Sequence, residues 1–436
     1  MPKSFLILVA TASFLLAQAP VGEPDEKFLK DVYEKAKSTP ADSPQFAKAH
    51  RDLAEFYCSQ SRYADAEPVY AKLLEEREHS FGLNSVEIVP DIAELARVNF
   101  AQMKFGQADT YWRRGLQIVE QTAGKQHKDL VPVLENLARA ALAQEKAEEA
   151  SKFLRRALAI REKLNDQRAS DLLMLAATLN LLGRSYMVEG KDAEAEASFV
   201  RALRTVEKAG GNALELSASL DNLGSYYLTR QKYEQAEPAL RRALAVRESS
   251  LGPVDPAIAP VLDQLGAAYN AQKKYPEAAK AYERALFIRM KSSSAEHPMT
   301  RMNVEKVAEV YAAQGKDTEA EPLYRQLLSA QENETVTSLV GLARLLASKE
   351  RTTEAENLFK TSISILDKGG WTTAKKPVIN PADPPPPILI EVLDDYAGVL
   401  KKMKKKGDAA KMEARARLLS GKADDSSRGK KNRDKN

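Results

Sequence analysis

The chain of 436 residues contains nearly the same helical segment several times. The segment KYEQAEPALRRALAVRE occupies 232–248, and a close variant, KYPEAAKAYERALFIRM, occupies 274–290. A Leu-Ala, Leu-Gly or Val-Ala pair recurs in steps that are mostly 42 residues long, and an alanine follows each pair at a constant distance. Two markers that keep one phase predict a solenoid of stacked repeats. The pairs begin at Leu53, Leu95, Leu137, Leu182, Leu223, Leu265, Val307 and Leu342.

The spacing within one copy predicts a hairpin of two helices. Leu223 and Tyr227 share one face of a first helix, beside the small residue Gly224. After a short turn, Ala236 and Leu240 form the facing stripe of a second helix. The small residues allow the helices to approach to the low end of the usual range of about 8–10 Å. One hairpin cannot bury its outer face, so each copy needs neighbours on both sides.

This pattern of large, small and aromatic positions resembles the tetratricopeptide repeat. The residues that carry the resemblance in one copy are Leu223, Gly224, Tyr227, Ala236, Leu240 and Ala243. The 42-residue step, with RALAVRE extending the second helix and LGPVDP following it at 251–256, is similar to the kinesin light chain form of the repeat. The resemblance covers 45–365 and implies an all-α fold, a right-handed superhelical solenoid of helix-turn-helix repeats. It also implies a scaffold that binds proteins or peptides in a concave groove.

The ends of the chain differ in composition from the array. Four prolines, Pro384 to Pro387, favour an extended polyproline conformation that interrupts the repeats. The last residues lack aromatic side chains and periodicity, which is typical of disorder. The predicted segments are 1–19, a signal peptide; 20–44, a capping helix and linker; 45–369, about eight repeats; 370–387, a proline-rich linker; 388–420, a helical hairpin; and 421–436, a basic tail.

The N-terminal segment MPKSFLILVATASFLLAQAP has the form of a secretory signal peptide. One lysine precedes an apolar run from Phe5 to Ala17, which is too short to span a bilayer. Cleavage after Ala19 would leave Pro20 first, a residue that disfavours cleavage, so the cleavage site stays open. We therefore expect an exported protein, periplasmic or extracellular. The alternative is that the run is a buried helix of a cytoplasmic adaptor or regulatory subunit.

The sequence offers no pattern for catalysis. It contains neither a Gly-rich phosphate loop nor a G-x-S-x-G turn. The four histidines are scattered without metal-ligand spacing, and Cys58 is the single cysteine. We expect no enzyme activity, no catalytic residue, no metal, no cofactor and no small-molecule substrate.

The first helices of such an array are expected to line the groove. Arg97, Arg139 and Arg184 each stand two positions after a marker residue, so they form a row at one level of adjacent repeats. Guanidinium groups bind carboxylates bidentately, which suits a peptide with acidic segments. The alternative is that Glu135 with Arg139, and Asn180 with Arg184, pair only within their own helices. The predicted peptide-binding residues are Arg97, Asn136, Arg139, Asn180, Arg184, Asn222, Asp221 and Asp263.

Charge is unevenly distributed along the chain. The net charge is +4, but residues 401–436 hold 14 basic and 5 acidic residues, so the rest carries 4 − 9 = −5. A basic tail can contact anionic surfaces, or it can simply keep the protein soluble. Nucleic acid is not an expected partner of an exported protein, so we expect a protein or peptide partner.

Overall fold

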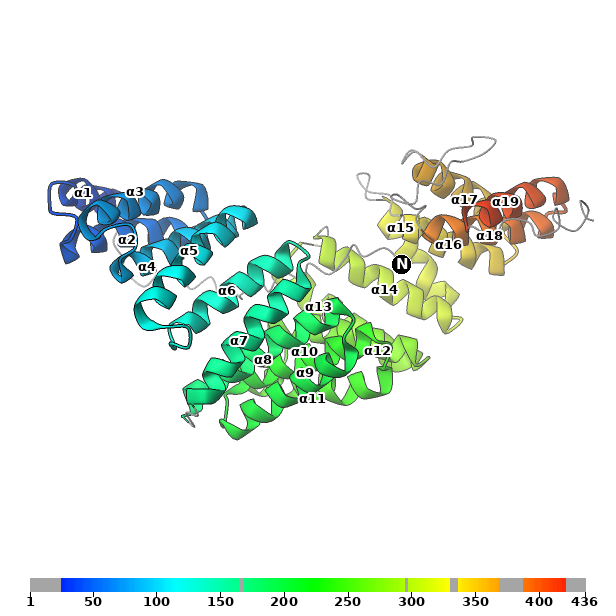
Figure 1. The fold of residues 1–436 in the computed structure, drawn as a ribbon. Helices are drawn as coiled ribbons and strands as arrows, with labels where there is room; N and C mark the ends of the chain where they lie inside the picture. The colour runs from blue at the N-terminus through cyan, green and yellow to red at the C-terminus, as the bar shows by residue number, and fades with distance from the viewer. Residues whose placement is uncertain (1–24, 165–167, 295–296, 330–335, 368–386, 421–436) are drawn as a thin grey trace, which may run out of the picture. The chain divides into compact units, whose positions relative to one another are not determined.

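The computed structural model describes residues 25–164, 168–294, 297–329, 336–367 and 387–420, and within these it is built from helices alone (Figure 1). The predicted all-α solenoid is confirmed. The chain divides into two compact units, 1–250 and 251–436, which are described separately. The predicted signal peptide, the basic tail and nearly all of the proline-rich linker lie outside the described residues.

The described part of the first unit starts with helix α1 and continues as helical hairpins. Its elements are α1 (Glu26–Ala36), α2 (Pro44–Ser59), α3 (Tyr63–Phe81), the 3-10 turn η1 (Val86–Ile88), α4 (Val89–Ala101), α5 (Phe105–Ala123), α6 (Leu130–Ala143), α7 (Ala147–Leu164), α8 (Ala169–Glu189), α9 (Asp192–Lys208), α10 (Ala213–Thr229) and α11 (Tyr233–Leu251), which ends at the boundary.

The second unit holds four further hairpins. Its elements are the 3-10 turn η2 (Pro256–Ile258), α12 (Ala259–Ala271), α13 (Tyr275–Ser292), α14 (Pro298–Ala313), α15 (Asp317–Ser329), α16 (Val336–Ser348), α17 (Thr352–Asp367), α18 (Pro387–Lys402) and α19 (Lys406–Leu419).

Close approach of the two helices in a hairpin depends on the small marker residues. An added Cβ on Gly224 of α10 would lie 2.6 Å from the side chain of Leu240 in α11. The same addition on Gly266 of α12 would lie 2.6 Å from the ring of Tyr282 in α13. Both distances are shorter than van der Waals contact, so a large residue of the second helix fills the space that glycine leaves. The sequence predicted close approach of the helices at Gly224, and the structure shows that Leu240 is the residue packed against it.

Each hairpin turn contains one residue in the left-handed backbone region. This residue always stands eight positions after the marker residue, as Gln231 follows Leu223. Most of these residues have a side chain, although the left-handed region favours glycine. The positive φ angles run from 57° to 77° at Ser61, Met103, Glu145, Gly190, Gln231, Lys273, Gly315, Glu350 and Lys404.

These turns give a stability prediction. Replacing Lys273 by glycine is expected to raise the free energy of unfolding by about 0.5–1 kcal/mol, because glycine adopts a φ of 59° without a Cβ clash. Gly315→Ala, at the equivalent turn, is the reciprocal control and is expected to lower it by a similar amount. Urea denaturation measures both. Destabilisation by Lys273→Gly would contradict the prediction.

Neighbouring hairpins are joined by a recurring ion pair. A lysine or arginine directly after the left-handed residue reaches a carboxylate near the start of the previous second helix. Lys104 contacts Glu67 at 2.6 Å, and Lys232 contacts Glu196 at 2.6 Å. In the second unit, Arg351 contacts Glu321 at 2.8 Å, and Lys405 contacts Glu356 at 2.7 Å. Arg62 contacts Glu26 of α1 at 2.7 Å, so α1 docks on the first hairpin in the way that a second helix does.

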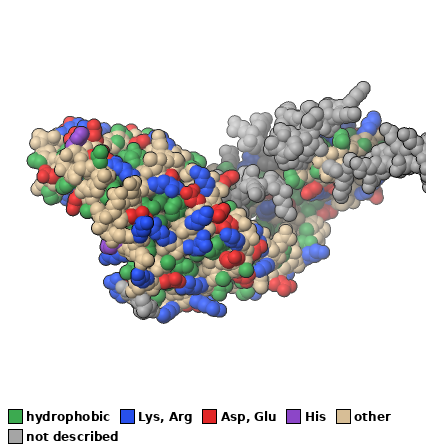
Figure 2. Space-filling view, viewed as in Figure 1, with side chains coloured by type: hydrophobic (Ala, Val, Ile, Leu, Met, Phe, Trp, Pro, Cys, Tyr) green, Lys and Arg blue, Asp and Glu red, His purple; other side chains and the backbone are tan. Residues whose placement is uncertain are grey.

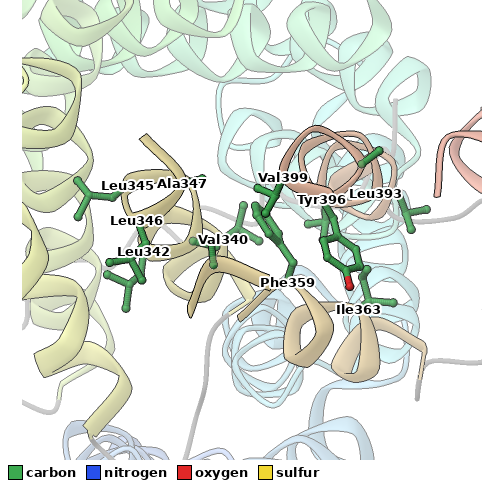
Figure 3. Close-up of a cluster of buried hydrophobic side chains, with 14 of the residues drawn as sticks. Val340, Leu342, Leu345, Leu346, Ala347, Phe359, Ile363, Leu393, Tyr396 and Val399 are labelled. Carbon is green, nitrogen blue, oxygen red and sulfur yellow. The ribbon is translucent and has the colours of Figure 1, made fainter. Parts of the chain in front are cut away.

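The last hairpin continues this pattern. Tyr396 and Ala397 of α18 occupy the marker positions, and Ala409 of α19 the small position of the second helix. All three side chains are buried. Figure 3 shows Phe359 of α17 beside Tyr396, and their ring centroids are 5.9 Å apart. Hairpin α18–α19 therefore packs on α16–α17 as one more repeat of the array.

Candidate functional site

The arginine row, which we define as Arg97, Arg139 and Arg184, lies on the first helices α4, α6 and α8 of the first unit, and Arg344 of α16 stands at the equivalent position of a hairpin in the second unit. Each member stands two positions after its marker residue. This position follows the buried Leu-Ala or Leu-Gly pair, so the side chain points away from the interior of the hairpin. Figure 2 shows basic and acidic side chains interspersed over one face of the molecule. An arginine can bind an external anion only where no neighbouring carboxylate already pairs with it, so the contacts of each arginine determine whether it is available.

Arg97 is paired within its own helix. Its Nε donates to Oε2 of Glu94 at 2.7 Å, and its Nη2 donates to Sγ of Cys58 at 3.8 Å. Burial disfavours the charged guanidinium, but the bond to Glu94 and that carboxylate's charge outweigh it, so the pKa of Arg97 is raised. Arg97 therefore already has an anionic partner.

Arg139 has a neutral partner. Its Nη1 donates to Oδ1 of Asn136 at 2.7 Å, and the side chain is exposed. The expected alternative pair with Glu135 is absent, because Glu135 accepts hydrogen bonds from Arg161 and Thr178 instead. Arg139 thus has no carboxylate of a described residue at its side.

Arg184 is the arginine of the row whose positive charge has the fewest polar partners. It is partly buried, and it forms no hydrogen bond or ion pair with any residue that the structure describes. Burial and the charge of nearby Arg139 lower the pKa of Arg184. The expected pair with Asn180 is absent, since Nδ2 of Asn180 donates to Oγ of Ser219 at 3.2 Å. Arg139 and Arg184 together form a cationic site between α6 and α8.

Each of the two predicted acidic residues pairs with an arginine of its own hairpin. Asp221 of α10 pairs with Arg247 of α11, and burial raises the pKa of Asp221 to about 6 despite that pairing. Asp263 of α12 accepts from Arg289 and from Nδ2 of Asn303, both at 2.5 Å. Their assignment to the groove stays a prediction. In the structure, both carboxylates are already bound to other side chains of the protein. Asn222, also on α10, makes no hydrogen bond to a described residue.

These pairs belong to a recurring motif that sequence analysis missed, in which the acidic residue lies in the same hairpin as the arginine or, for Asp91, in the next one. An arginine late in the second helix holds an acidic residue of a first helix. Arg77 donates to Oδ2 of Asp91 at 2.8 Å, and Arg51 approaches Oδ1 of the same carboxylate at 2.5 Å. The sequence signal for this motif is the second arginine of RALAVRE and of its copies, which keeps a fixed distance from the marker residue. The pairs are Arg77–Asp91, Arg161–Glu135, Arg247–Asp221 and Arg289–Asp263.

Arg344, at the equivalent position in the second unit, shows what an arginine at this position binds when a carboxylate is available. Its Nε donates to Oδ2 of Asp395 at 2.6 Å, and its Nη2 donates to Oε2 of Glu391 at 3.3 Å. Both acceptors lie on α18, the first helix of the next hairpin. Burial lowers the pKa of Arg344, but the nearby carboxylates raise it by more, chiefly through the hydrogen bond to Asp395. The pKa of Arg344 is therefore raised.

Neither a metal centre nor a membrane span is found among the described residues. No three His, Cys, Asp or Glu side chains gather there as metal ligands. None of the helices described combines the length and apolar character that crossing a bilayer requires. His50 is buried, with Nδ1 2.8 Å from the carbonyl oxygen of Phe46, and no titratable side chain of the described ranges hydrogen-bonds to it.

Solved structures are similar to the chain at low sequence identity, and those of the first two described below share its fold. The apo form of RapI is 13% identical, with a TM-score of 0.60 over 86% of this chain and 99% of that one. A signal-transduction ATPase with a tetratricopeptide repeat sensor from Pyrococcus horikoshii is 17% identical, with a TM-score of 0.54 over 80% and 54%. A putative kinesin light chain from Podosopora anserina is 22% identical, with a TM-score of 0.42 over 52% and 98%.

No curated protein sequence is significantly similar to the chain. The sequence profile of the tetratricopeptide repeat, by contrast, matches most of the array. Its matches cover 88–163, 174–249, 230–291, 257–333 and 298–368, which is more than half of the chain. Repeats of this kind indicate a scaffold for protein–protein interaction. The predicted family is confirmed, and the chain belongs to the tetratricopeptide repeat family.

Proposed function

We propose that the protein is a non-catalytic scaffold that binds an acidic protein segment at Arg139 and Arg184. The observation that carries this proposal is the state of Arg184. Arg97 and Arg344 each have a carboxylate in the structure, whereas Arg184 has none among the described residues. A partly buried guanidinium without an anion is costly, and a partner's carboxylate relieves that cost.

Neighbouring amides suit the same ligand. Asn136 already contacts Arg139, and its amide nitrogen can donate to a carbonyl or carboxylate oxygen. The side-chain amide of Asn222, on the next first helix after Arg184, has no described partner. Asp221 does not oppose an incoming anion with a full free charge, because Arg247 neutralises it. An acidic peptide thus meets two cations and two amides.

Binding of a fluorescein-labelled Glu-Ser repeat peptide tests the proposal by fluorescence anisotropy. The double variant Arg139→Gln and Arg184→Gln is expected to weaken binding at least about tenfold, since two charge-assisted hydrogen-bonding groups are removed. Added salt is expected to imitate the variant, because partly exposed charges are screened.

The matched control removes the same charge elsewhere. Arg155 of α7 and Arg204 of α9 are exposed and have no hydrogen bond or ion pair with a described residue. Their double replacement by glutamine is expected to leave peptide binding within about twofold of the parent. If both double variants lose affinity equally, only net charge matters and the proposed site is wrong.

We also propose that the protein acts outside the cytoplasm. The apolar run from Phe5 to Ala17 and the Ala-Gln-Ala that overlaps its end support this proposal. N-terminal sequencing of the mature protein tests it, because export predicts a chain that starts near Pro20. A mature chain that starts at residue 1 or 2 would favour the cytoplasmic adaptor.

A further inference from the structure

We infer that the partner of the Arg139–Arg184 site presents an α-helix with two carboxylates four residues apart. This inference rests on the proposed function of that site and adds the shape of the ligand. Its basis is an internal example in the same chain, where Arg344 receives two carboxylates from α18.

The contact at Arg344 has a defined geometry. Glu391 and Asp395 stand four residues apart on α18, so they lie one above the other on a single helical face. The guanidinium of Arg344 divides its donors between them, with Nε on Asp395 at 2.6 Å and Nη2 on Glu391 at 3.3 Å. One arginine at this position is thus matched to one turn of an acidic helix.

Arg184 occupies the same place in its hairpin as Arg344 does. Each stands two residues after its marker, and in each case the first helix of the next hairpin packs alongside, α10 beside α8 and α18 beside α16. The positions that carry Glu391 and Asp395 before the marker of α18 are held by Ala218 and Asn222 before the marker of α10. Neither residue is anionic, so α10 leaves Arg184 without the acidic pair that α18 supplies to Arg344.

A helix is the conformation that can deliver this pair. Side chains four residues apart on a helix have Cβ atoms about 5–6 Å apart. In an extended chain, which rises about 3.3 Å per residue, the same residues would be roughly 13 Å apart. Two carboxylates also match the two charges of Arg139 and Arg184, so the complex of site and ligand is neutral.

Three fluorescein-labelled peptides of equal acidic content separate the possibilities. The first is a hydrocarbon-stapled helix with glutamate and aspartate four residues apart on the face opposite the staple. The second is the same stapled helix with the acidic residues two apart, on different faces. The third keeps the four-residue spacing but contains two central prolines that prevent a helix.

The first peptide is expected to bind the full-length protein at least about tenfold more tightly than the others, and Arg184→Gln is expected to remove that preference. If the second or third peptide binds equally well and also depends on Arg184, the helical inference is overturned while the proposed function stands. If no peptide binds in an Arg184-dependent way, the proposed function fails and the inference fails with it.

Transfer of the acidic pair into α10 gives an independent test. Ala218 is exposed and Asn222 is half-buried, so Ala218→Glu with Asn222→Asp can place two carboxylates beside Arg184. This variant is expected to lose at least about tenfold in affinity for the first peptide, with an unchanged circular dichroism spectrum. The neutral control is Ala218→Gln with Asn222 retained, which has the same shape without the charges and is expected to keep most of the affinity. Equal affinity of the acidic variant and the parent would overturn the inferred equivalence of the two sites.

Discussion

Replacement of Asp91 by alanine is expected to lower the free energy of unfolding by about 3–5 kcal/mol. Asp91 is fully buried, and both of its carboxylate oxygens are occupied by guanidinium groups. Its removal leaves Arg77, which is itself buried, next to an empty space and without a counter-charge. An uncompensated buried charge is among the few causes of so large an effect.

Hydrogen exchange of the Asp91→Ala protein measures where the damage lies. Because hairpins in a solenoid interact with their nearest neighbours, α2 to α5 are expected to lose amide protection before α8 to α11 do. Glu94→Ala removes a partly exposed pair with Arg97 on the same helix and is expected to cost below about 1 kcal/mol. A similar loss in both variants would show that burial of the Asp91 pair has little energetic weight.

Introduction of valine at Gly266 is expected to cost about 3 kcal/mol, through overpacking. The new Cβ would lie 2.6 Å from the ring of Tyr282, which is itself buried in the hairpin and has little room to move. Thermal and urea denaturation measure the loss. Ala236→Leu, at a fully buried small position of α11, is expected to act by the same mechanism at about 1–3 kcal/mol.

Gly398 of α18 provides the opposite case within the same chain. A Cβ added there meets no atom within 4 Å, and the residue lies inside a helix. Gly398→Ala is therefore expected to stabilise the protein by about 0.5–1 kcal/mol, since alanine loses less backbone entropy than glycine. If Gly266→Val were tolerated as well as Gly398→Ala, close helix approach would not be what fixes the marker positions.

The spacing of small residues predicted the hairpins and their cores, because close helix contact admits few side chains at such positions. The close approach of the helices at Gly224 follows directly from that spacing. Buried ion pairs were not predicted from the same sequence. Arg247 reads as the polar end of an amphipathic helix, and its partner Asp221 lies 26 residues earlier on another helix. A contact between residues so far apart in sequence is found only when the residues at equivalent positions of the two helices are compared across all repeats.

The contacts of the predicted site residues could not be read from the sequence for a related physical reason. Periodicity places Arg97, Arg139 and Arg184 at one level, but it does not state which neighbour each arginine meets. Which partner each side chain bonds to depends on the polar residues available on its own helix and on the next first helix. Asn180 bonds to Ser219 on α10 in place of Arg184, and Arg97 bonds to Glu94. Local charge pairing along a helix was therefore a poor guide to Arg184.

The same ion pair joins several neighbouring hairpins at equivalent positions. Lys405 on Glu356 joins the last hairpin with the same two positions that Lys104 and Glu67 use at the other end of the chain. A hairpin that carries both halves of this connection can be followed by another that carries them, so duplication of one such module leaves two surfaces whose ion pair still matches, whereas hairpins with Ser151 or Ala279 at the carboxylate position lack it. Such a step changes the number of arginines at the row position only when the module carries one, which those with Ser225, Ala267 and Glu309 at that position do not.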